Sequence, residues 1–217
     1  MPPIRTVALV DGFNLYHALD ELNAHHLKWL DLRALLLNFA LPPQFHLDRV
    51  LYFSAYATWI PDAYARHRAY VAALEATGVD VVMGKFKKKP RSCKRCGASW
   101  EGHEEKETDV NLALKLLELA YADAFDRALV LSADSDLAPA VRAVRRLFPE
   151  KEVRILTPPG RFIPGDLRDA AGHPGTGIRD IHVRRCLFGE EVLDPTTSQI
   201  AARRPASYAP PQPSGAG

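Results

Sequence analysis

The chain is poor in cysteine, with three in 217 residues. Three thiols cannot close a disulfide framework, and a chain of this size does not need one, so we expect a reducing compartment and a cytoplasmic protein. The sequence also lacks any apolar stretch near the ~18 residues that a membrane span requires. Its first residues lack the basic segment and long apolar core of a signal peptide. We therefore expect no contact with a membrane.

The chain also has almost no net charge. Its 28 Lys and Arg residues nearly balance 26 Asp and Glu residues, which leaves +2. This sum predicts no charged partner, so only the distribution of the charges can do so. Hydrophobic residues make up 47% and charged residues 25%, a globular composition that excludes a wholly disordered chain. The length fits a single domain of ordinary size.

Short apolar runs alternate with segments of helical spacing along most of the chain. We expect strands at 6–10, 49–56, 79–83, 128–132, 152–157 and 178–187, and helices at 15–22, 32–39, 62–76, 108–122, 137–147 and 167–171. This alternation predicts an α/β fold in which a parallel sheet is flanked by helices. Residues 195–217 are rich in Pro, Ser, Thr, Ala and Gly, so we expect a folded domain at 1–194 followed by a disordered tail.

Polar side chains follow the first and fourth of these strands and open the helix at 108–122. They are Asp11, Asn14, Asp109, Ser132, Asp134 and Asp136. Ligands bind outside the carboxyl ends of the strands in an open parallel sheet, so a fold of this kind can gather these side chains on one rim. Clustered carboxylates repel one another, and a divalent cation relieves that repulsion. Oxygen-only ligands predict Mg²⁺ or Mn²⁺, which typically serve phosphate chemistry.

Three of these acids also have a purely structural interpretation. Asp11 with Gly12 can form a turn, Asp109 can complement a helix dipole, and Asp136 can cap the helix that follows it. A structural role does not explain why three separate segments each place an acid at a strand end or a helix start. The combination favours a metal site.

Three blocks of sequence carry these residues. They are Val10-Asp11-Gly12-Phe13-Asn14, Glu105-Lys106-Glu107-Thr108-Asp109-Val110 and Leu131-Ser132-Ala133-Asp134-Ser135-Asp136-Leu137. In order and spacing they resemble the signature blocks of the NYN family, which belongs to the PIN-like nuclease superfamily. Two of the blocks depart from the family pattern. Ala133 stands where the third block usually has Gly, and Glu107-Thr108 stands where the second usually has Gly-Val.

The resemblance implies a Rossmann-like (PIN-like) fold and hydrolysis of RNA phosphodiester bonds by a metal-activated water. The acids that bind Mg²⁺ or Mn²⁺ in the family correspond to Asp11, Asp109, Asp134 and Asp136. The Asn of the first block corresponds to Asn14, and the Ser of the third block corresponds to Ser132. These two are expected to orient the metal ligands or to position the phosphate.

Residues 85–107 interrupt the alternation and form an insertion that contains two of the three cysteines. Cys93 and Cys96 lie in a Cys-x-x-Cys-Gly sequence of the form found in zinc knuckles. We expect a structural zinc site with His103 as the third ligand. The candidates for the fourth ligand are Cys186, His173 and His182. A redox-active pair and two unconnected thiols are the alternatives.

The same insertion contains seven basic residues with no acid among them. They are Lys85, Lys87, Lys88, Lys89, Arg91, Lys94 and Arg95. Because this run directly precedes the second acidic block, we expect it to bind the RNA backbone, with Phe86 and Trp100 available to stack on bases. A solvated charged loop is the alternative for the run, and packing within the insertion is the alternative for both rings.

Two other functions are open from the sequence. One is a non-catalytic RNA-binding or regulatory module with a PIN-like fold, and the other is a nuclease that acts on DNA. The full set of acids favours the enzyme. A homo-oligomer is compatible with the sequence, which identifies neither the RNA target nor the assembly.

Overall fold

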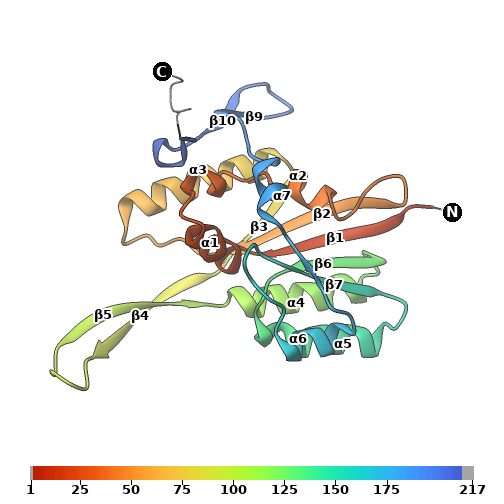
Figure 1. The fold of residues 1–217 in the computed structure, drawn as a ribbon, viewed down its shortest axis with the longest axis horizontal. Coiled ribbons are helices and arrows are strands. Elements are labelled where there is room, and N and C mark those ends of the chain that lie inside the picture. Colours follow the sequence, from red (N-terminus) through yellow and green to blue (C-terminus); the bar gives the residue numbers. More distant parts are fainter. Residues whose placement is uncertain (1, 212–217) are drawn as a thin grey trace.

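The computed structural model describes residues 2–211. A six-stranded sheet with the order β3-β2-β1-β6-β7-β8 runs through the centre (Figure 1). Its strands are β1 (Ile4–Asp11), β2 (Phe45–Ser54), β3 (Val79–Met83), β6 (Arg127–Leu131), β7 (Glu152–Thr157) and β8 (Thr176–Gly177). All neighbouring strands in it are parallel, which confirms the predicted α/β class. The order also places the first and fourth predicted strands, β1 and β6, side by side.

Helices cover both faces of the sheet (Figure 1). One face carries α1 (Gly12–Glu21), α2 (Leu32–Leu37) and α3 (Pro61–Ala76), and the other carries α4 (Thr108–Tyr121), α5 (Ala138–Leu147) and α6 (Gly165–Ala171). Successive side chains of a strand point to opposite faces, so Ala8 and Val10 join the first core and Val7 and Leu9 join the second. This burial on both sides explains the uninterrupted apolar run of β1. Within the described residues, no helix is both long and apolar enough to cross a membrane.

The insertion at 85–107 contains a β-hairpin outside the central sheet. β4 (Lys85–Ser92) pairs antiparallel with β5 (Ser99–Lys106), and the hairpin extends away from the body of the protein (Figure 1). The Cys-x-x-Cys sequence forms the turn between the two strands. Lys and Glu are uncommon in strands, so the composition of the insertion concealed this structure.

Two predictions for the C-terminal part are wrong. Residues 178–187 do not form a strand, because they contain helix α7 (Asp180–Arg184). The segment from 195 to 211 is not disordered either. There, β10 (Ile200–Arg203) pairs with β9 (Glu191–Leu193), and a 3-10 turn at Ala206–Tyr208 buries Tyr208 against the core. The composition was misleading because a few apolar side chains anchor the segment. Residues 212–217 of the predicted tail lie outside the described residues.

Candidate active site at the carboxyl edge of the sheet

Asp11 ends β1 and caps the helix that follows. Its Oδ1 accepts a hydrogen bond from the backbone N–H of Asn14 (2.9 Å), which is the N-terminal capping interaction of α1. Its Oδ2 accepts a hydrogen bond from Ser132 Oγ (2.8 Å). The two side chains meet because Val10 of β1 lies beside Leu131 of β6. Asp11 is only 3% exposed, so its carboxylate is held in a fixed position.

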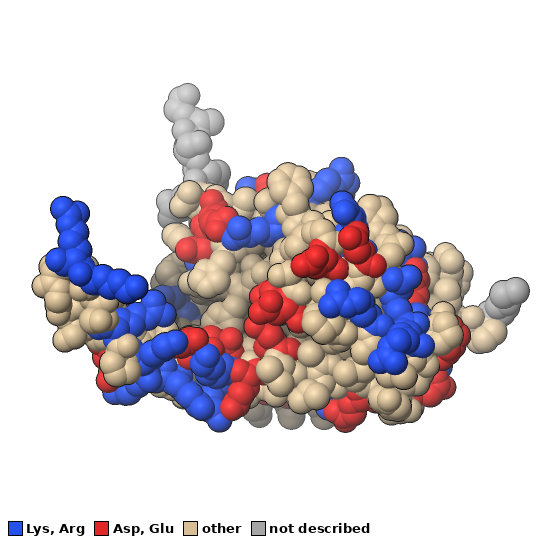
Figure 2. All heavy atoms as spheres, turned by 90° about the horizontal axis from the view of Figure 1, so that it is seen from below, with Lys and Arg blue, Asp and Glu red and all other residues tan. Residues whose placement is uncertain are grey.

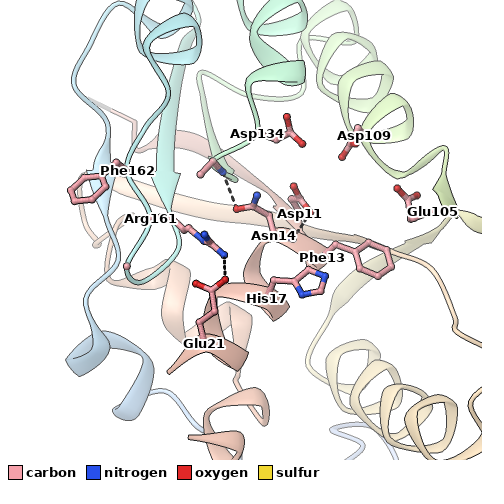
Figure 3. Close-up of a pocket in the computed structure, with 12 residues that line it drawn as sticks. Asp11, Phe13, Asn14, His17, Glu21, Glu105, Asp109, Asp134, Arg161 and Phe162 are labelled. Carbon is pink, nitrogen blue, oxygen red and sulfur yellow. Dashed lines mark hydrogen bonds and ion pairs between the residues drawn. The ribbon is translucent and has the colours of Figure 1, made fainter. Parts of the chain in front are cut away.

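A second set of hydrogen bonds joins the loop after β6 to α1. The backbone N–H of Ala133 donates to Asn14 Oδ1 (3.0 Å), and the backbone N–H of Asp134 donates to Ser132 Oγ (3.0 Å). The N–H of Asp136 in turn donates to Asp134 Oδ1 (2.8 Å). Side chains of the site itself therefore fix the conformation of this loop. They place Asp134 on the same side of the pocket as Asp11 (Figure 3).

Two more acids come from the segment around the start of α4. Asp109 lies in the first helical turn, and Glu105 lies near the end of β5. Glu105 Oε1 accepts a hydrogen bond from the backbone N–H of Thr108 (2.9 Å) and also contacts Thr108 Oγ1. Glu105 thus satisfies an N–H group at the start of α4 that has no partner within the helix.

These acids line one cavity of about 750 Å³ at the carboxyl edge of the sheet. Asp11, Glu105, Asp109 and Asp134 surround it on one side, as Figure 3 shows. On another side of the cavity, Arg161 pairs with Glu21 at 2.5 Å. The three segments that the sequence analysis singled out therefore meet, as expected for the carboxyl ends of parallel strands.

Burial and mutual repulsion raise the pKa values of two of these acids. The pKa of Asp109 rises to about 6, first because the carboxyl group is partly buried and then because Asp11, Asp134, Glu105 and Asp136 lie nearby. Burial also raises the pKa of Asp11, although the hydrogen bonds from Asn14 and Ser132 oppose the rise. A cation in this cavity would favour the charged form of both carboxyl groups.

The donors fit a hard divalent cation, but they do not enclose one as they stand. Among residues 2–211, no three His, Cys, Asp or Glu side chains form a group that could hold a metal ion directly. The acids instead surround a cavity with room for water. Mg²⁺ typically keeps several of its waters and takes only one or two carboxylates, so such an arrangement suits it.

The structure brings four of the six predicted site residues to the cavity wall. They are Asp11, Asn14, Asp109 and Asp134. Ser132 is buried behind Asp11 and contacts the cavity only through it. Asp136 is exposed and does not belong to the cavity lining, although its charge acts on Asp109.

Glu105 and Arg161 line the cavity and were not predicted as site residues. In the second block, Glu105 and Glu107 were equally available, and only the course of β5 decides which of them faces the cavity. Arg161 follows the end of β7 by four residues. The strand-end rule that selected Asp11 and Asp134 applies to β7 as well and would have found it.

Glu107 adopts a backbone conformation that favours glycine. Its φ is +81°, and it occupies the position where the NYN pattern usually has Gly. The left-handed region costs a residue with a Cβ about 1–2 kcal/mol. We expect Glu107→Gly to relieve this strain and to raise the free energy of unfolding by roughly 0.5–1 kcal/mol. The gain is smaller than the strain itself, because glycine also has more conformational entropy in the unfolded chain.

Urea denaturation of the two proteins measures this change. Glu107 also forms an exposed ion pair with Lys85, and Lys85→Ala removes that pair alone as a control. A Glu107→Gly variant less stable than both wild type and Lys85→Ala would contradict the backbone argument.

The hairpin brings acids opposite part of the predicted RNA-binding run. Lys85 pairs with Glu107, Lys88 with Glu101 (2.8 Å) and Lys89 with Glu104 (2.8 Å). In the described part of the chain, the remaining basic residues of the run form no ion pair, namely Lys87, Arg91, Lys94 and Arg95. Lys and Arg gather over this arm while Asp and Glu gather beside it near the centre (Figure 2). The run is therefore less basic than its sequence suggests.

The predicted zinc site with Cys93, Cys96 and His103 is wrong for the described residues. His103 stacks on Trp59, with ring centroids 3.7 Å apart, and it lies opposite Lys88 rather than at the hairpin turn. The other candidates are also engaged elsewhere. Cys186 is buried beside Asn38, His173 contacts the carbonyl of Val153, and His182 contacts Arg179. The strand register separates His103 from the cysteines, and spacing alone could not reveal it.

Two known proteins are similar to this chain. One is 6-hydroxy-3-succinoylpyridine 3-monooxygenase HspA from Pseudomonas putida, which is 27% identical over 179 residues. That alignment covers 66% of this chain and 56% of the relative, so the chain spans little more than half of that protein. The other is the crystal structure of a protein of unknown function from Vibrio parahaemolyticus. It matches with a TM-score of 0.55 and 19% identity over 86% of this chain and 97% of that one, which concerns the fold alone.

The family comparison covers the three blocks and the whole cavity. The NYN domain model matches residues 5–174, which contain every strand of the central sheet except β8. The match includes Asp11, Glu105, Asp109 and Asp134. The chain belongs to the NYN family, within the PIN-like nuclease superfamily.

Proposed function

We propose that the acidic cavity is the active site of a ribonuclease that depends on Mg²⁺ or Mn²⁺. The observation that carries the proposal is the convergence of acids from β1, β5, α4 and the loop after β6 on one open cavity, with the pKa of Asp109 raised to about 6. If the acids had only structural roles, nothing would offset the repulsion between their carboxylates. Active sites are where such shifts concentrate.

Asp11, Asp109 and Asp134 are the residues that would hold the cation, in part through its bound waters, and Glu105 and Asp136 are near enough to orient those waters. When bound, a divalent cation supplies Lewis acidity toward a phosphoryl oxygen and lowers the pKa of a bound water. The protein contributes the rigid frame. Ser132 holds Asp11 from behind (2.8 Å), so its carboxylate is aimed before any ligand arrives.

Asn14 is placed to bind the phosphate. Its Oδ1 is engaged by the backbone N–H of Ala133 (3.0 Å), so it can present its Nδ2 donor to a phosphate oxygen in the cavity. Arg161 on the other side offers a guanidinium group, which exchanges its pairing with Glu21 for a phosphate when RNA binds. Together these groups can orient the scissile bond.

The hairpin is proposed to bind the RNA backbone through those of its Lys and Arg side chains that form no ion pair. Two matched variants test this. We expect the triple variant Lys87→Ala, Arg91→Ala, Lys94→Ala to weaken RNA binding and to flatten its salt dependence. The slope of log K against log salt should fall by about 2, because each single-strand phosphate contact contributes about 0.7. Fluorescence anisotropy over a salt series measures it.

The matched control is the triple variant Lys85→Ala, Lys88→Ala, Lys89→Ala, which removes the same charge from residues that already have Glu partners. We expect a clearly smaller change in slope for this control. Equal slopes for both variants would mean that ion pairing within the hairpin does not decide which side chains meet RNA.

The choice between RNA and DNA requires matched substrates. We expect purified protein in Mg²⁺ or Mn²⁺ to cleave a single-stranded RNA oligonucleotide and to leave the DNA oligonucleotide of the same sequence largely intact. Excess chelator should abolish the activity, and Mg²⁺ or Mn²⁺ should restore it. Cleavage of DNA alone would reassign the substrate. Tight RNA binding without cleavage of either strand would indicate the non-catalytic module.

A further inference from the structure

A second cavity of about 530 Å³ lies next to the acidic one. It opens between α1 and α3, beyond the carboxyl end of β2, one strand along from Asp11. Phe13, His17 and Glu105 line both cavities, so the two are directly adjacent. A nucleic acid strand whose phosphate reaches the acids therefore passes directly by the mouth of the second cavity.

Aromatic side chains form the walls of this second cavity. Phe86 of the hairpin lies edge-on to Phe13, with ring centroids 5.6 Å apart, and Trp59, which does not line the cavity, packs edge-on against Phe86 at 4.7 Å. Deeper inside, Tyr52 meets Tyr70 at 5.9 Å. Phe86 was predicted to stack on bases, and it lines the cavity rather than the exposed outer part of the hairpin. Such walls suit a flat, apolar-faced ligand.

Polar groups at the inner end can read the edge of such a ligand. The Tyr52 hydroxyl lies 3.4 Å from His67 Nε2, and Ser54 lines the same cavity. Burial lowers the pKa of His67 to about 4, so its ring is neutral at physiological pH and offers one donor and one acceptor. Burial also raises the pKa of Tyr52, which keeps its hydroxyl proton. Neutral donors and acceptors complement the edge of a nucleobase.

The C-terminal segment contributes to the wall of this cavity. Tyr208, from the segment that composition assigned to a disordered tail, is 8% exposed and forms part of the lining. The cavity, with its volume of about 530 Å³, has room for one base and its sugar.

We propose that this aromatic cavity binds the base of one nucleotide next to the phosphate held at the acidic cavity. The inference rests on the proposed ribonuclease function and adds a substrate requirement to it. The base leaves the stack of the RNA strand, enters between α1 and α3, and stacks on the aromatic walls. Bases are extruded in this way wherever a protein must read or react with a single nucleotide.

An abasic scan tests the requirement for a base. A single-stranded RNA with one cleavage site is prepared with an abasic nucleotide at each position around that site in turn. When the abasic nucleotide is at one particular position adjacent to the cleaved bond, we expect kcat/KM for the wild-type protein to fall about 10-fold. This is the effect expected for losing one base that stacks on an aromatic side chain. Abasic positions further away should have little effect. Uniform cleavage of all these substrates would overturn the inference while leaving the nuclease function intact.

A variant that fills the pocket links the effect to this cavity. Ala63 of α3 lines the pocket, and Ala63→Trp should lower kcat/KM about 10-fold on intact RNA. On the sensitive abasic substrate, the losses should not add, because the variant and the missing base remove the same contact. The matched control is Ala65→Trp, which places the same ring on the exposed side of α3 and should change neither substrate. Additive losses would overturn the assignment of the base to this pocket.

A binding measurement separates this inference from the nuclease proposal. The Asp11→Asn, Asp134→Asn double variant binds RNA that carries 2-aminopurine at the sensitive position, or at each position in turn if no cleavage is found. We expect its fluorescence to be quenched by the aromatic walls, and Ala63→Trp added to the double variant should prevent the quenching. Quenching in the double variant, together with no RNA cleavage by the wild-type protein, would refute the nuclease and retain the pocket. Fluorescence that Ala63→Trp does not change would refute the pocket.

Discussion

Asp109→Asn is expected to make the protein more stable and to abolish RNA cleavage. The pKa of Asp109 is raised from its ordinary value of 3.8 to about 6, so the folded protein binds this proton more tightly than the unfolded chain does. A raised carboxyl pKa gives stability that is present below pH 3.8 and lost as the pH rises through about 6. At pH 7 the charged side chain therefore opposes folding, and the neutral amide removes that repulsion.

The gain in stability is moderate because the side chain is only half buried. Allowing for solvent screening, we expect about 1 kcal/mol at pH 7 without divalent metal, or a rise in Tm of about 2–4 °C. The rate of RNA cleavage should fall at least about 100-fold. Removing a group that only orients a metal ligand costs up to about this much, and Asp109 is proposed to hold the metal itself. The wild-type Tm in chelator should decrease between pH 4 and pH 6 more steeply than that of Asp109→Asn.

Asp166→Asn is the matched control for this prediction. Asp166 also lies in the first turn of a helix, α6, but it lies outside the acidic cavity. Its replacement removes a favourable interaction with the helix dipole, so Tm should fall slightly and cleavage should not change. If Asp109→Asn lowered the Tm in chelator as Asp166→Asn does, the carboxylates would not repel one another in the folded protein.

Gly12→Ala is expected to disrupt the fold at the site. A Cβ on Gly12 would lie 2.6 Å from the backbone carbonyl oxygen of Phe53 and 2.7 Å from the ring of Tyr52. The carbonyl belongs to β2 and cannot turn away, so α1 must shift from the sheet. We expect a loss of about 3 kcal/mol or more, and a fall in Tm of about 6–12 °C. Cleavage should fall further than stability alone explains, because Asp11 and Asn14 flank this residue.

Gly165→Ala controls for adding a methyl group at the first residue of a helix. Gly165 begins α6, and the nearest atom to its Cβ would be 4.0 Å away. We expect this variant to be as stable as the wild type or slightly more stable, since alanine favours helix over glycine. Differential scanning calorimetry of both variants gives the comparison. A Gly12→Ala protein with wild-type Tm would show that α1 does not pack as closely as described.

The acidic part of the site could be predicted because it depends on local sequence and one topological rule. Asp11 and Asp134 each follow a buried strand, and Asp109 opens a strongly amphipathic helix. The carboxyl ends of parallel strands share one edge, so Asp11 and Asp134 meet there, and the start of α4 brings Asp109 to the same edge. That reasoning needs no knowledge of side-chain contacts.

The remaining features depend on pairings that no local pattern specifies. The hairpin register places Glu101 and Glu104 against Lys88 and Lys89, which removes charge that the sequence seemed to offer. The same register carries His103 to Trp59 and away from the cysteines. The aromatic cavity was not predicted because its walls come from α1, α3, the hairpin and the C-terminal turn. Only the tertiary fold brings those segments together.

We propose above that the carboxylates of the acidic cavity hold the metal that cleaves RNA. The most direct measurement follows cleavage of 5′-labelled single-stranded RNA in Mg²⁺ or Mn²⁺ by the wild type and by the Asp11→Asn, Asp134→Asn double variant. Both proteins are purified identically and checked for folding. We predict metal-dependent cleavage by the wild type and no cleavage above background by the double variant. Cleavage by the folded double variant at the wild-type rate would contradict the claim.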